Sequence, residues 1–138
     1  MMGQPIDVPP RFHTFLAFDF GAKRTGVVVG NRISRTATPQ ATIRAESNDA
    51  RLAAAQERVR EWQPDALVVG VPFHPDGASH DNTSRARKFA RQLAARTQLA
   101  VYEVDERYST TEALAGGAGD PDAGAACVIL EQFLRSLT

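Results

Sequence analysis

The sequence has few residues for disulfide or thiolate chemistry. Its 138 residues contain one cysteine, Cys127, and three histidines, His13, His74 and His80. A single cysteine excludes a disulfide framework and a cluster of thiolate metal ligands. The histidines lack an H-x-x-x-H spacing, so a zinc site is not expected. Cys127 lies among alanine, valine and isoleucine, and we expect it to be a core residue.

Long apolar runs and a net charge are also lacking. The longest apolar runs, such as residues 66–72, are far shorter than the roughly 20 residues of a membrane-spanning helix, and no secretory signal is expected. Lysine and arginine number 16 and so do aspartate and glutamate, so any basic surface for nucleic acid must be local. Apolar residues make up 43% and charged residues 23%, which is typical of a soluble globular protein. We expect a cytoplasmic protein with no membrane partner.

Hydrophobic periodicity predicts one domain over residues 13–138. Residues 1–12 contain three prolines and are expected to form a poorly ordered tail. Short strands at 15–18, 27–29 and 36–43 follow one another with short links, which predicts an antiparallel meander. Pro39 confines the third strand to an edge or a bulge, and Gly30 with Asn31 predicts a hairpin turn after the second.

The second half of the chain alternates helices with strands. A helix begins near Ser47, Asn48 and Asp49, all good N-cap residues, and Pro64 ends it. A strand at 66–71, a helix at 82–97, a strand at 99–104 and a helix at 122–137 follow. This alternation implies parallel pairing and hence an α/β fold with a mixed sheet. The expected inner faces of the first two helices are Leu52, Ala55, Val59 and Trp62, and Ala86, Phe89, Ala90 and Leu93.

Acidic residues follow the carboxyl ends of two predicted strands. Asp19 follows the first strand, Asp105 and Glu106 follow the last, and Asp122 begins the final helix. Ligands of open α/β sheets bind at these strand ends. Carboxylates brought within about 4 Å repel by roughly 4 kcal/mol at an effective dielectric near 20, which a hard cation such as Mg²⁺ or Mn²⁺ relieves. The alternative is structural: Asp122 caps the helix and Asp105 pairs with Arg107.

Two groups of cations are candidates for binding phosphate. Residues 19–26, D-F-G-A-K-R-T-G, place Lys23 and Arg24 in a glycine-containing turn that a phosphate could approach closely. The segment lacks the Lys-Ser/Thr ending of a Walker A loop. In the helix at 82–97 the cations fall opposite the apolar face and no acid follows Asp81. The alternative for both groups is solvated surface charge. The helical cations are Arg85, Arg87, Lys88, Arg91 and Arg96.

Several segments, in the order found here, resemble the YqgF/RuvX family. The resemblance runs from about residue 15 to residue 134, nearly the whole chain. It is carried by F-D-F-G-A-K-R-T-G at 18–26, T-A-T-P at 36–39, V-G-V-P at 69–72 with Asp76-Gly77, R-A-R-K-F-A at 85–90, D-E-R-Y-S-T-T-E-A at 105–113, and the final helix from Asp122.

The resemblance implies an RNase H-like fold, in which three antiparallel strands and then parallel strands form a five-stranded mixed sheet flanked by helices. It also implies a metal-dependent nuclease, a hydrolase of phosphodiester bonds. The family's acids correspond to Asp19, Glu106 and Asp122, which would be both catalytic residues and ligands of Mg²⁺ or Mn²⁺, with Asp105 as a helper. The implied role is processing of the 5′ end of precursor 16S rRNA in ribosome biogenesis, with structured RNA and pre-ribosomal particles as partners.

The chain departs from the family pattern in one connection. Family members carry a longer, basic segment before the last acid, whereas residues 113–121 contain no lysine or arginine. Substrate contacts then depend on other cations. Lys23, Arg24 or Arg107 would neutralise the phosphate. The helical cations would hold the backbone of the substrate, and they are Arg85, Arg87, Lys88 and Arg91.

Two other functions stay open on the sequence, and a third is set aside. A resolvase cutting four-way DNA junctions would use the same acids and would act as a two-fold dimer, so either a monomer or a homodimer is expected. A non-catalytic ribosome-assembly module would need the basic helix and not the acids. Sugar-kinase-like ATPases share the pattern Asp-x-Gly-x-x-x-x-Gly, but they need two such lobes, and 138 residues hold one.

Overall fold

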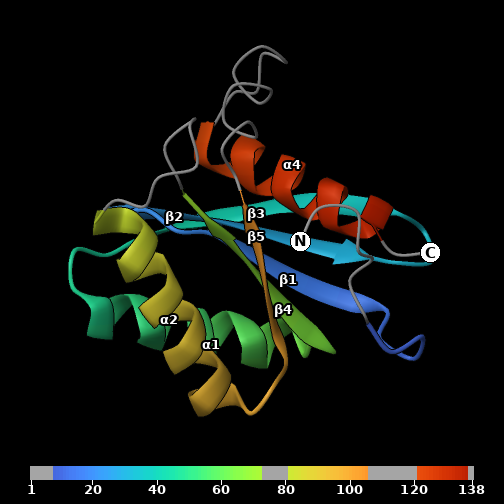
Figure 1. Ribbon diagram of the computed structural model, residues 1–138, viewed down its shortest axis with the longest axis horizontal. Coiled ribbons are helices and arrows are strands. Elements are labelled where there is room, and N and C mark those ends of the chain that lie inside the picture. Colours follow the sequence, from blue (N-terminus) through green and yellow to red (C-terminus); the bar gives the residue numbers. More distant parts are fainter. Residues whose placement is uncertain (1–7, 73–80, 106–120, 137–138) are drawn as a thin grey trace.

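The computed structural model describes residues 8–72, 81–105 and 121–136, which form a five-stranded sheet with helices on both faces (Figure 1). The strands are β1 (Thr14–Asp19), β2 (Arg24–Asn31), β3 (Thr36–Arg44), β4 (Ala66–Val71) and β5 (Val101–Asp105). The helices are α1 (Asn48–Trp62), α2 (Asp81–Thr97) and α4 (Pro121–Ser136). All the predicted elements are present in the predicted order.

The sheet joins an antiparallel half to a parallel half at β1. Its strand order is β3-β2-β1-β4-β5. The β1–β2 and β2–β3 pairs are antiparallel, and the β1–β4 and β4–β5 pairs are parallel. The predicted mixed sheet is therefore confirmed. β3 is an edge strand, as Pro39 predicts, because proline has no N–H to donate to a further strand.

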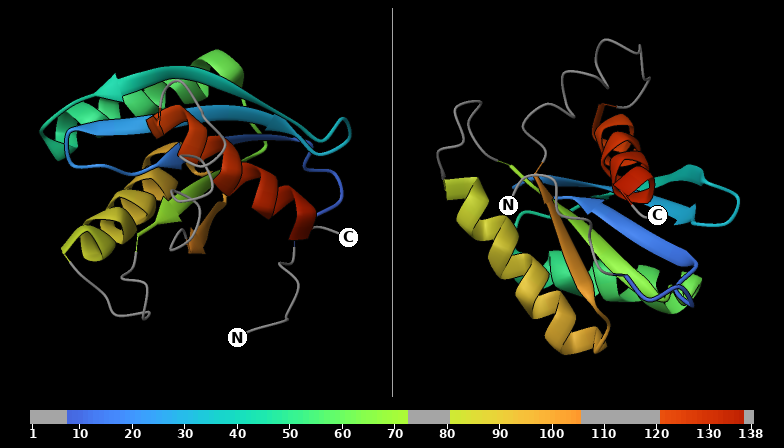
Figure 2. Two further views of the ribbon diagram at one scale, coloured as in Figure 1. Left: turned by 90° about the horizontal axis from the view of Figure 1, so that it is seen from above. Right: turned by 45° about the vertical axis from the view of Figure 1, so that its right-hand side comes forward.

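The two faces of β1 pack into two separate hydrophobic cores. Phe18 faces α1 and α2, and its ring meets that of Phe89 edge-on with centroids 5.9 Å apart. Phe15 and Ala17 face α4, where Phe15 meets Phe133 with centroids 5.3 Å apart. Figure 2 shows α1 and α2 on one side of the sheet and α4 on the other. β1 is therefore held from both faces and by strands on both edges.

Helix α1 begins at a predicted cap residue, since the Ser47 side chain accepts a hydrogen bond from the Ala50 N–H at 3.1 Å. Its predicted inner face is only partly right. Trp62 is 38% exposed, because the buried stripe of α1 consists of Arg51, Leu52 and Ala55 in its first half and does not continue to the last turn.

Helix α2 buries the four residues that its periodicity predicts. It packs over β4 and β5, with its apolar side in the same core as Phe18. The buried face of α2 consists of Ala86, Phe89, Ala90 and Leu93.

None of the helices in the described part of the chain has the length and apolar character needed to cross a membrane.

The predicted turn at Gly30 and Asn31 lies later in the chain. Both residues belong to β2, and Asn31 Oδ1 accepts the N–H groups of Ile33 and Ser34 at 2.9 and 3.1 Å in the turn that follows. Gly30 is glycine because α4 packs on it: a Cβ there would collide with the Leu130 side chain and lie 2.9 Å from the Thr36 carbonyl oxygen. Close packing, and not turn geometry, explains this glycine.

Residues 8–12 are packed on the domain, although the prolines predicted a poorly ordered tail. Val8 is 6% exposed and lies in the core against α4, with Phe12 packed beside it. The Pro9 carbonyl accepts a hydrogen bond from Arg32 at 3.0 Å. The burial of the Val8 side chain in the core therefore holds this segment against the domain. Residues 1–7 of the expected tail lie outside the described part of the chain. Cys127, expected in the core, is partly buried against the same cluster.

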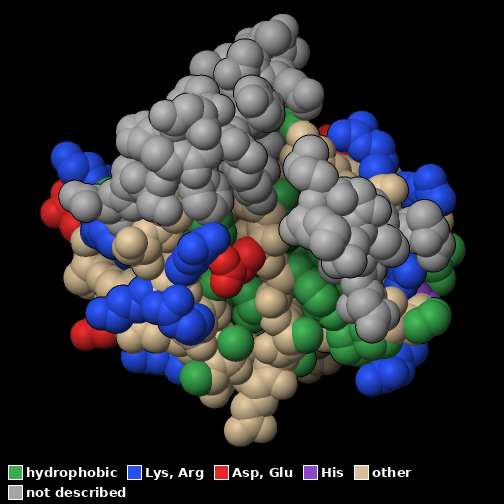
Figure 3. Space-filling view, viewed as in Figure 1, with side chains coloured by type: hydrophobic (Ala, Val, Ile, Leu, Met, Phe, Trp, Pro, Cys, Tyr) green, Lys and Arg blue, Asp and Glu red, His purple; other side chains and the backbone are tan. Residues whose placement is uncertain are grey.

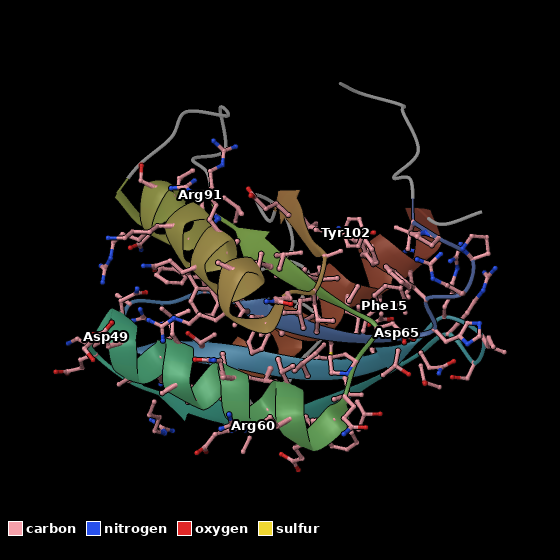
Figure 4. All side chains as sticks on the ribbon, turned by 90° about the horizontal axis from the view of Figure 1, so that it is seen from below. Phe15, Asp49, Arg60, Asp65, Arg91 and Tyr102 are labelled. Carbon is pink, nitrogen blue, oxygen red and sulfur yellow. The ribbon has the colours of Figure 1, made fainter. Side chains whose placement is uncertain are left out.

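Asp65 fastens the start of β1 to the connection before β4. Its Oδ2 accepts the N–H groups of His13 and Thr14 at 2.8 and 3.0 Å, and its own N–H donates to the Thr14 carbonyl at 2.8 Å. Figure 4 shows Asp65 close to Phe15 at this end of the sheet. The hydrogen bonds from Thr14 and His13 lower the pKa of the Asp65 carboxyl, because they stabilise its ionised form.

Asp65→Asn is expected to lower the free energy of unfolding by about 1 kcal/mol at neutral pH. A carboxyl with a lowered pKa stabilises the fold above its unfolded pKa of about 4 and loses that contribution as the pH falls through the folded value. The deficit of the variant should therefore shrink at about pH 3. Urea unfolding at both pH values measures it, with exposed Glu57→Gln as control. An equal deficit at both pH values would contradict the role of the ionised carboxylate.

Candidate active site at the carboxyl edge of the sheet

Three parallel strands place their carboxyl ends at one edge of the sheet. In the register, Asp19 is level with Gly70, and Val71 is level with Asp105. β4 lies between β1 and β5, so the backbones at Asp19 and Asp105 are about 10 Å apart. Asp19 is partly buried, and strand alternation places it on the face of Ala17, toward α4.

Two helices also begin at this edge. The hydroxyl of buried Thr83, in the first turn of α2, donates to the carbonyl of Pro72 just after β4. The first turn of α4 lies at the same end of the molecule (Figures 1 and 2). Asp122 is the second residue of α4, where the helix dipole favours a carboxylate.

The structure locates only some of the predicted acidic residues. The structure brings Asp19, the end of β5 and the start of α4 to one edge, while Glu106 and Arg107 lie outside the described residues. Of Asp122 and Asp105 the backbone alone is described. Within residues 8–72, 81–105 and 121–136, no group of three or more His, Cys, Asp or Glu residues is arranged to hold a metal ion.

A tight turn follows Asp19. A Cβ on Gly21 would collide with the Arg24 carbonyl, so only glycine fits at this position. Thr25, which is 1% exposed, lies with its hydroxyl 3.5 Å from the Gly21 carbonyl oxygen, to which it donates. The Lys23 carbonyl accepts the N–H of Ala45 at 3.1 Å, which ties the turn to the end of β3. The glycine-containing segment is thus a compact, braced turn.

A buried arginine, Arg51 of α1, lies beneath this turn. It is 1% exposed, and one guanidinium nitrogen donates to the Ala22 carbonyl at 2.6 Å and to the Ala45 carbonyl at 3.3 Å. The guanidinium also lies over the Phe20 ring, 4.7 Å from its centroid. Burial, and then the nearby Arg85 guanidinium, lower the pKa of Arg51. Arg51 therefore joins the loop after β1 to the segment that links β3 to α1.

Sequence reasoning missed Arg51. Its only signal was helical spacing, because residue 51 lies on the same stripe as Leu52 and Ala55. A single arginine in a helix is ordinarily read as a solvated charge.

The predicted basic residues of α2 are exposed on its outer side. Figure 3 shows Lys and Arg side chains gathered over α2, and Figure 4 places Arg91 there. Arg87 has an acidic neighbour: its Nε lies 3.4 Å from Glu103 Oε1 on β5. The exposed cations of this α2 surface are Arg85, Arg87, Lys88, Arg91 and Arg96.

A second basic region lies on the other side of β1. A pocket of about 470 Å³ is lined by Lys23, Arg24, Arg44, Ala45 and Glu46. Arg44 and Glu46 were not among the predicted site residues. Arg44 is the last residue of the edge strand β3, and Glu46 lies two residues beyond it. Both are exposed, so the sequence gives no sign that they lie beside the Lys23 turn.

The fold and the acidic edge define an RNase H-like α/β protein, and comparisons with solved structures agree. The structure of RuvC from T. thermophilus in complex with a Holliday junction substrate aligns with a TM-score of 0.59 at 16% identity, covering 86% of this chain and 90% of that chain. Fowlpox virus resolvase in complex with Holliday junction DNA aligns with a TM-score of 0.62 at 10% identity, covering 89% and 97%. Identities this low establish the fold alone.

Sequence comparisons identify the family. The RuvX family model, described as Holliday junction resolvase, matches residues 13–136. A relative from Polaromonas sp. is 75% identical over 90% of this chain and 89% of its own length. A relative from Albidiferax ferrireducens is 66% identical over 96% and 85%. Both are provisionally named pre-16S rRNA nucleases. The chain belongs to the RuvX family, which confirms the predicted resemblance.

Arg51→Met is expected to lower the free energy of unfolding by about 2–4 kcal/mol, because it leaves two carbonyls without their donor beneath the turn. Arg51→Lys should lose less, since an ammonium can still donate to one of them. Urea unfolding measures both, with exposed Arg60→Met as the matched control. A loss for Arg51→Met within about 0.5 kcal/mol of the control, the range of ordinary surface substitutions, would contradict the bracing role.

Proposed function

We propose that this protein is a metal-dependent nuclease that processes the 5′ end of precursor 16S rRNA, with Asp19, Glu106 and Asp122 as its catalytic carboxylates. The observation that carries the proposal is the position of Asp19, on the central strand and on the α4 face of the edge where β5 ends and α4 begins. The RuvX relatives named for pre-16S rRNA cleavage support the substrate.

The chemistry of the candidate donors fits a hard divalent cation. Asp19 is a partly buried carboxylate at the end of a strand held on both faces, so its backbone position is fixed. Glu106 follows Asp105, the last residue of β5, directly in the sequence. Asp122 follows the first residue of α4. An oxygen-only set favours Mg²⁺ or Mn²⁺ over softer metals.

In this proposal the three carboxylates hold the cation, and the cations of the chain hold the substrate. A bound Mg²⁺ or Mn²⁺ supplies Lewis-acid chemistry, which activates water and offsets charge on the phosphate. Hydrolysis joins the water oxygen to phosphorus as one ester P–O bond breaks, and the leaving oxygen takes a proton. Lys23, Arg24 or Arg107 stabilises the negative charge that grows on the phosphate oxygens.

The α2 surface extends the site beyond the scissile phosphate. α2 packs over β4 and β5 and begins beside the end of β4, so its cations flank the carboxyl edge. Arg85, Arg87, Lys88 and Arg91 contact backbone phosphates, which provide affinity without base specificity. The substrate is structured RNA, in the context of pre-ribosomal particles in the cytoplasm.

Cleavage of a four-way DNA junction is the second candidate function. The RuvX family description and the two junction-bound resolvases of the same fold favour it. A resolvase makes two symmetric cuts and therefore acts as a two-fold dimer, whereas the processing nuclease can act as a monomer. The same carboxyl edge of the sheet would serve either substrate. The two functions are therefore distinguished by which substrate the protein cleaves.

Asp19→Asn is expected to reduce metal-dependent cleavage of an RNA carrying the 5′ precursor junction of 16S rRNA by about 100-fold or more, because a ligand charge is lost at nearly constant shape. Gel analysis of end-labelled RNA with Mn²⁺ measures the rate. Asp49→Asn, the same change at an exposed residue of α1, should cleave at the wild-type rate. The urea concentration at the midpoint of unfolding should be at least as high for both variants as for the wild type.

A mobile four-way DNA junction serves as the competing substrate in the same assay. The proposal predicts cleavage of the RNA in preference to the junction. Paired symmetric cuts in the junction, with the RNA intact, would favour the resolvase. A fully active Asp19→Asn variant would refute the assignment of the catalytic acid, and binding without cleavage of either substrate would favour a non-catalytic assembly module.

A further inference from the structure

Two arginines face each other directly across β2 and β3. Arg24 at the start of β2 is in register with Arg44 at the end of β3, and both are exposed. Like charges directly opposite each other in a sheet are destabilising. Lys23 precedes Arg24 and adds a third cation. The strand register therefore gathers three cations at one place, where an anion would be attracted by all of them.

The space beside these cations has the size and the lining of an anion site. The pocket lined by Lys23, Arg24, Arg44, Ala45 and Glu46, here named the β2–β3 pocket, measures about 470 Å³. Its lining combines three cationic side chains with one carboxylate, so positive charge prevails. None of the described residues that line it is aromatic, so these residues offer no ring on which a base could stack. These features fit the sugar-phosphate backbone better than a nucleobase.

The two walls of the β2–β3 pocket are fixed relative to each other. Arg51 donates to Ala22 on one wall and to Ala45 on the other, and the Ala45 N–H donates to the Lys23 carbonyl. The walls are thus joined beneath the pocket by a buried side chain that is itself cationic. A site held in this way loses little conformational entropy when it binds.

The pocket lies on the opposite side of Asp19 from the α2 surface. Asp19 is in register with Gly26 of β2, and Arg24 precedes Gly26 by two residues, about 7 Å along the strand. In the order β3-β2-β1-β4-β5, the pocket is on the β2–β3 side and α2 covers β4 and β5. A nucleic-acid strand that crosses the carboxyl edge at Asp19 can therefore reach cations on both sides.

We propose that the β2–β3 pocket binds a backbone phosphate of the nucleic-acid substrate, next to the scissile phosphate, with Arg44 and Lys23 as its main donors. Arg24 and Arg107 are then the cations left for the scissile phosphate. The proposal rests on the proposed function in taking nucleic acid as the substrate. It adds Arg44 as a phosphate ligand, assigns Arg51 as the positioning residue of the pocket, and gives Glu46 an opposing effect on affinity.

The test measures binding of a fluorescently labelled precursor 16S rRNA fragment by anisotropy, without metal, in the Asp19→Asn background. Arg44→Gln is expected to weaken binding about five- to tenfold at low salt and to reduce the slope of log affinity against log salt by about 1, the loss of one phosphate contact. Glu46→Gln should strengthen binding. Arg60→Gln, which removes the same charge from the exposed last turn of α1, should leave affinity unchanged.

Arg44→Gln that binds like Arg60→Gln, with the same affinity and salt slope, would overturn the pocket as a phosphate site. So would an Asp19→Asn background that does not bind the RNA at all. In the cleavage assay with Asp19 intact, Arg44→Gln should raise KM by a larger factor than it lowers kcat. Loss of affinity in Arg44→Gln together with no cleavage by the wild type would contradict the proposed nuclease activity and leave the phosphate site supported.

Discussion

The position of β1 is the constraint on which the rest of the structure depends. This strand is the junction between the antiparallel and the parallel half of the sheet, and it has a hydrophobic core on each face. A shift of one residue would move Phe15 and Phe18 to the wrong cores. Asp65 fastens the start of β1, and β2 and β4 fix its register. The position of Asp19 at the far end follows from these contacts.

The loop after β1 depends on a different interaction, the buried guanidinium of Arg51. A buried charge is costly unless its donors are used. The terminal nitrogens of Arg51 donate to Asn48 and to two backbone carbonyls, and the guanidinium lies over the Phe20 ring, whereas its Nε has no hydrogen-bond partner among the described residues. The same contacts hold Lys23 beside Arg44 and so form the β2–β3 pocket. One side chain of α1 thereby connects the stability of the domain with the arrangement of cations beside Asp19.

Patterns within single segments predicted most of the fold. The valines of β2, the cap at Ser47 and the periodicity of α2 each identify an element from neighbouring residues, and the acids after strands point to the carboxyl edge. The features that were missed depend on contacts between distant segments. Gly30 is explained by α4, Arg51 by the turn at Ala22, and Arg44 by its register with Arg24. The sequence around an arginine does not show which distant residues will lie beside it in the fold.

The central claim is that Asp19 belongs to a carboxylate set that holds a divalent cation at this edge. Titration of the protein with Mn²⁺, followed by the electron paramagnetic resonance signal of the unbound ion, tests it without any substrate. Asp19→Asn should bind Mn²⁺ at least about tenfold more weakly than the wild type, since one anionic ligand is lost, while Asp49→Asn should bind like the wild type. Equal affinity for Mn²⁺ in the wild type and Asp19→Asn would show that Asp19 is not a ligand of the cation.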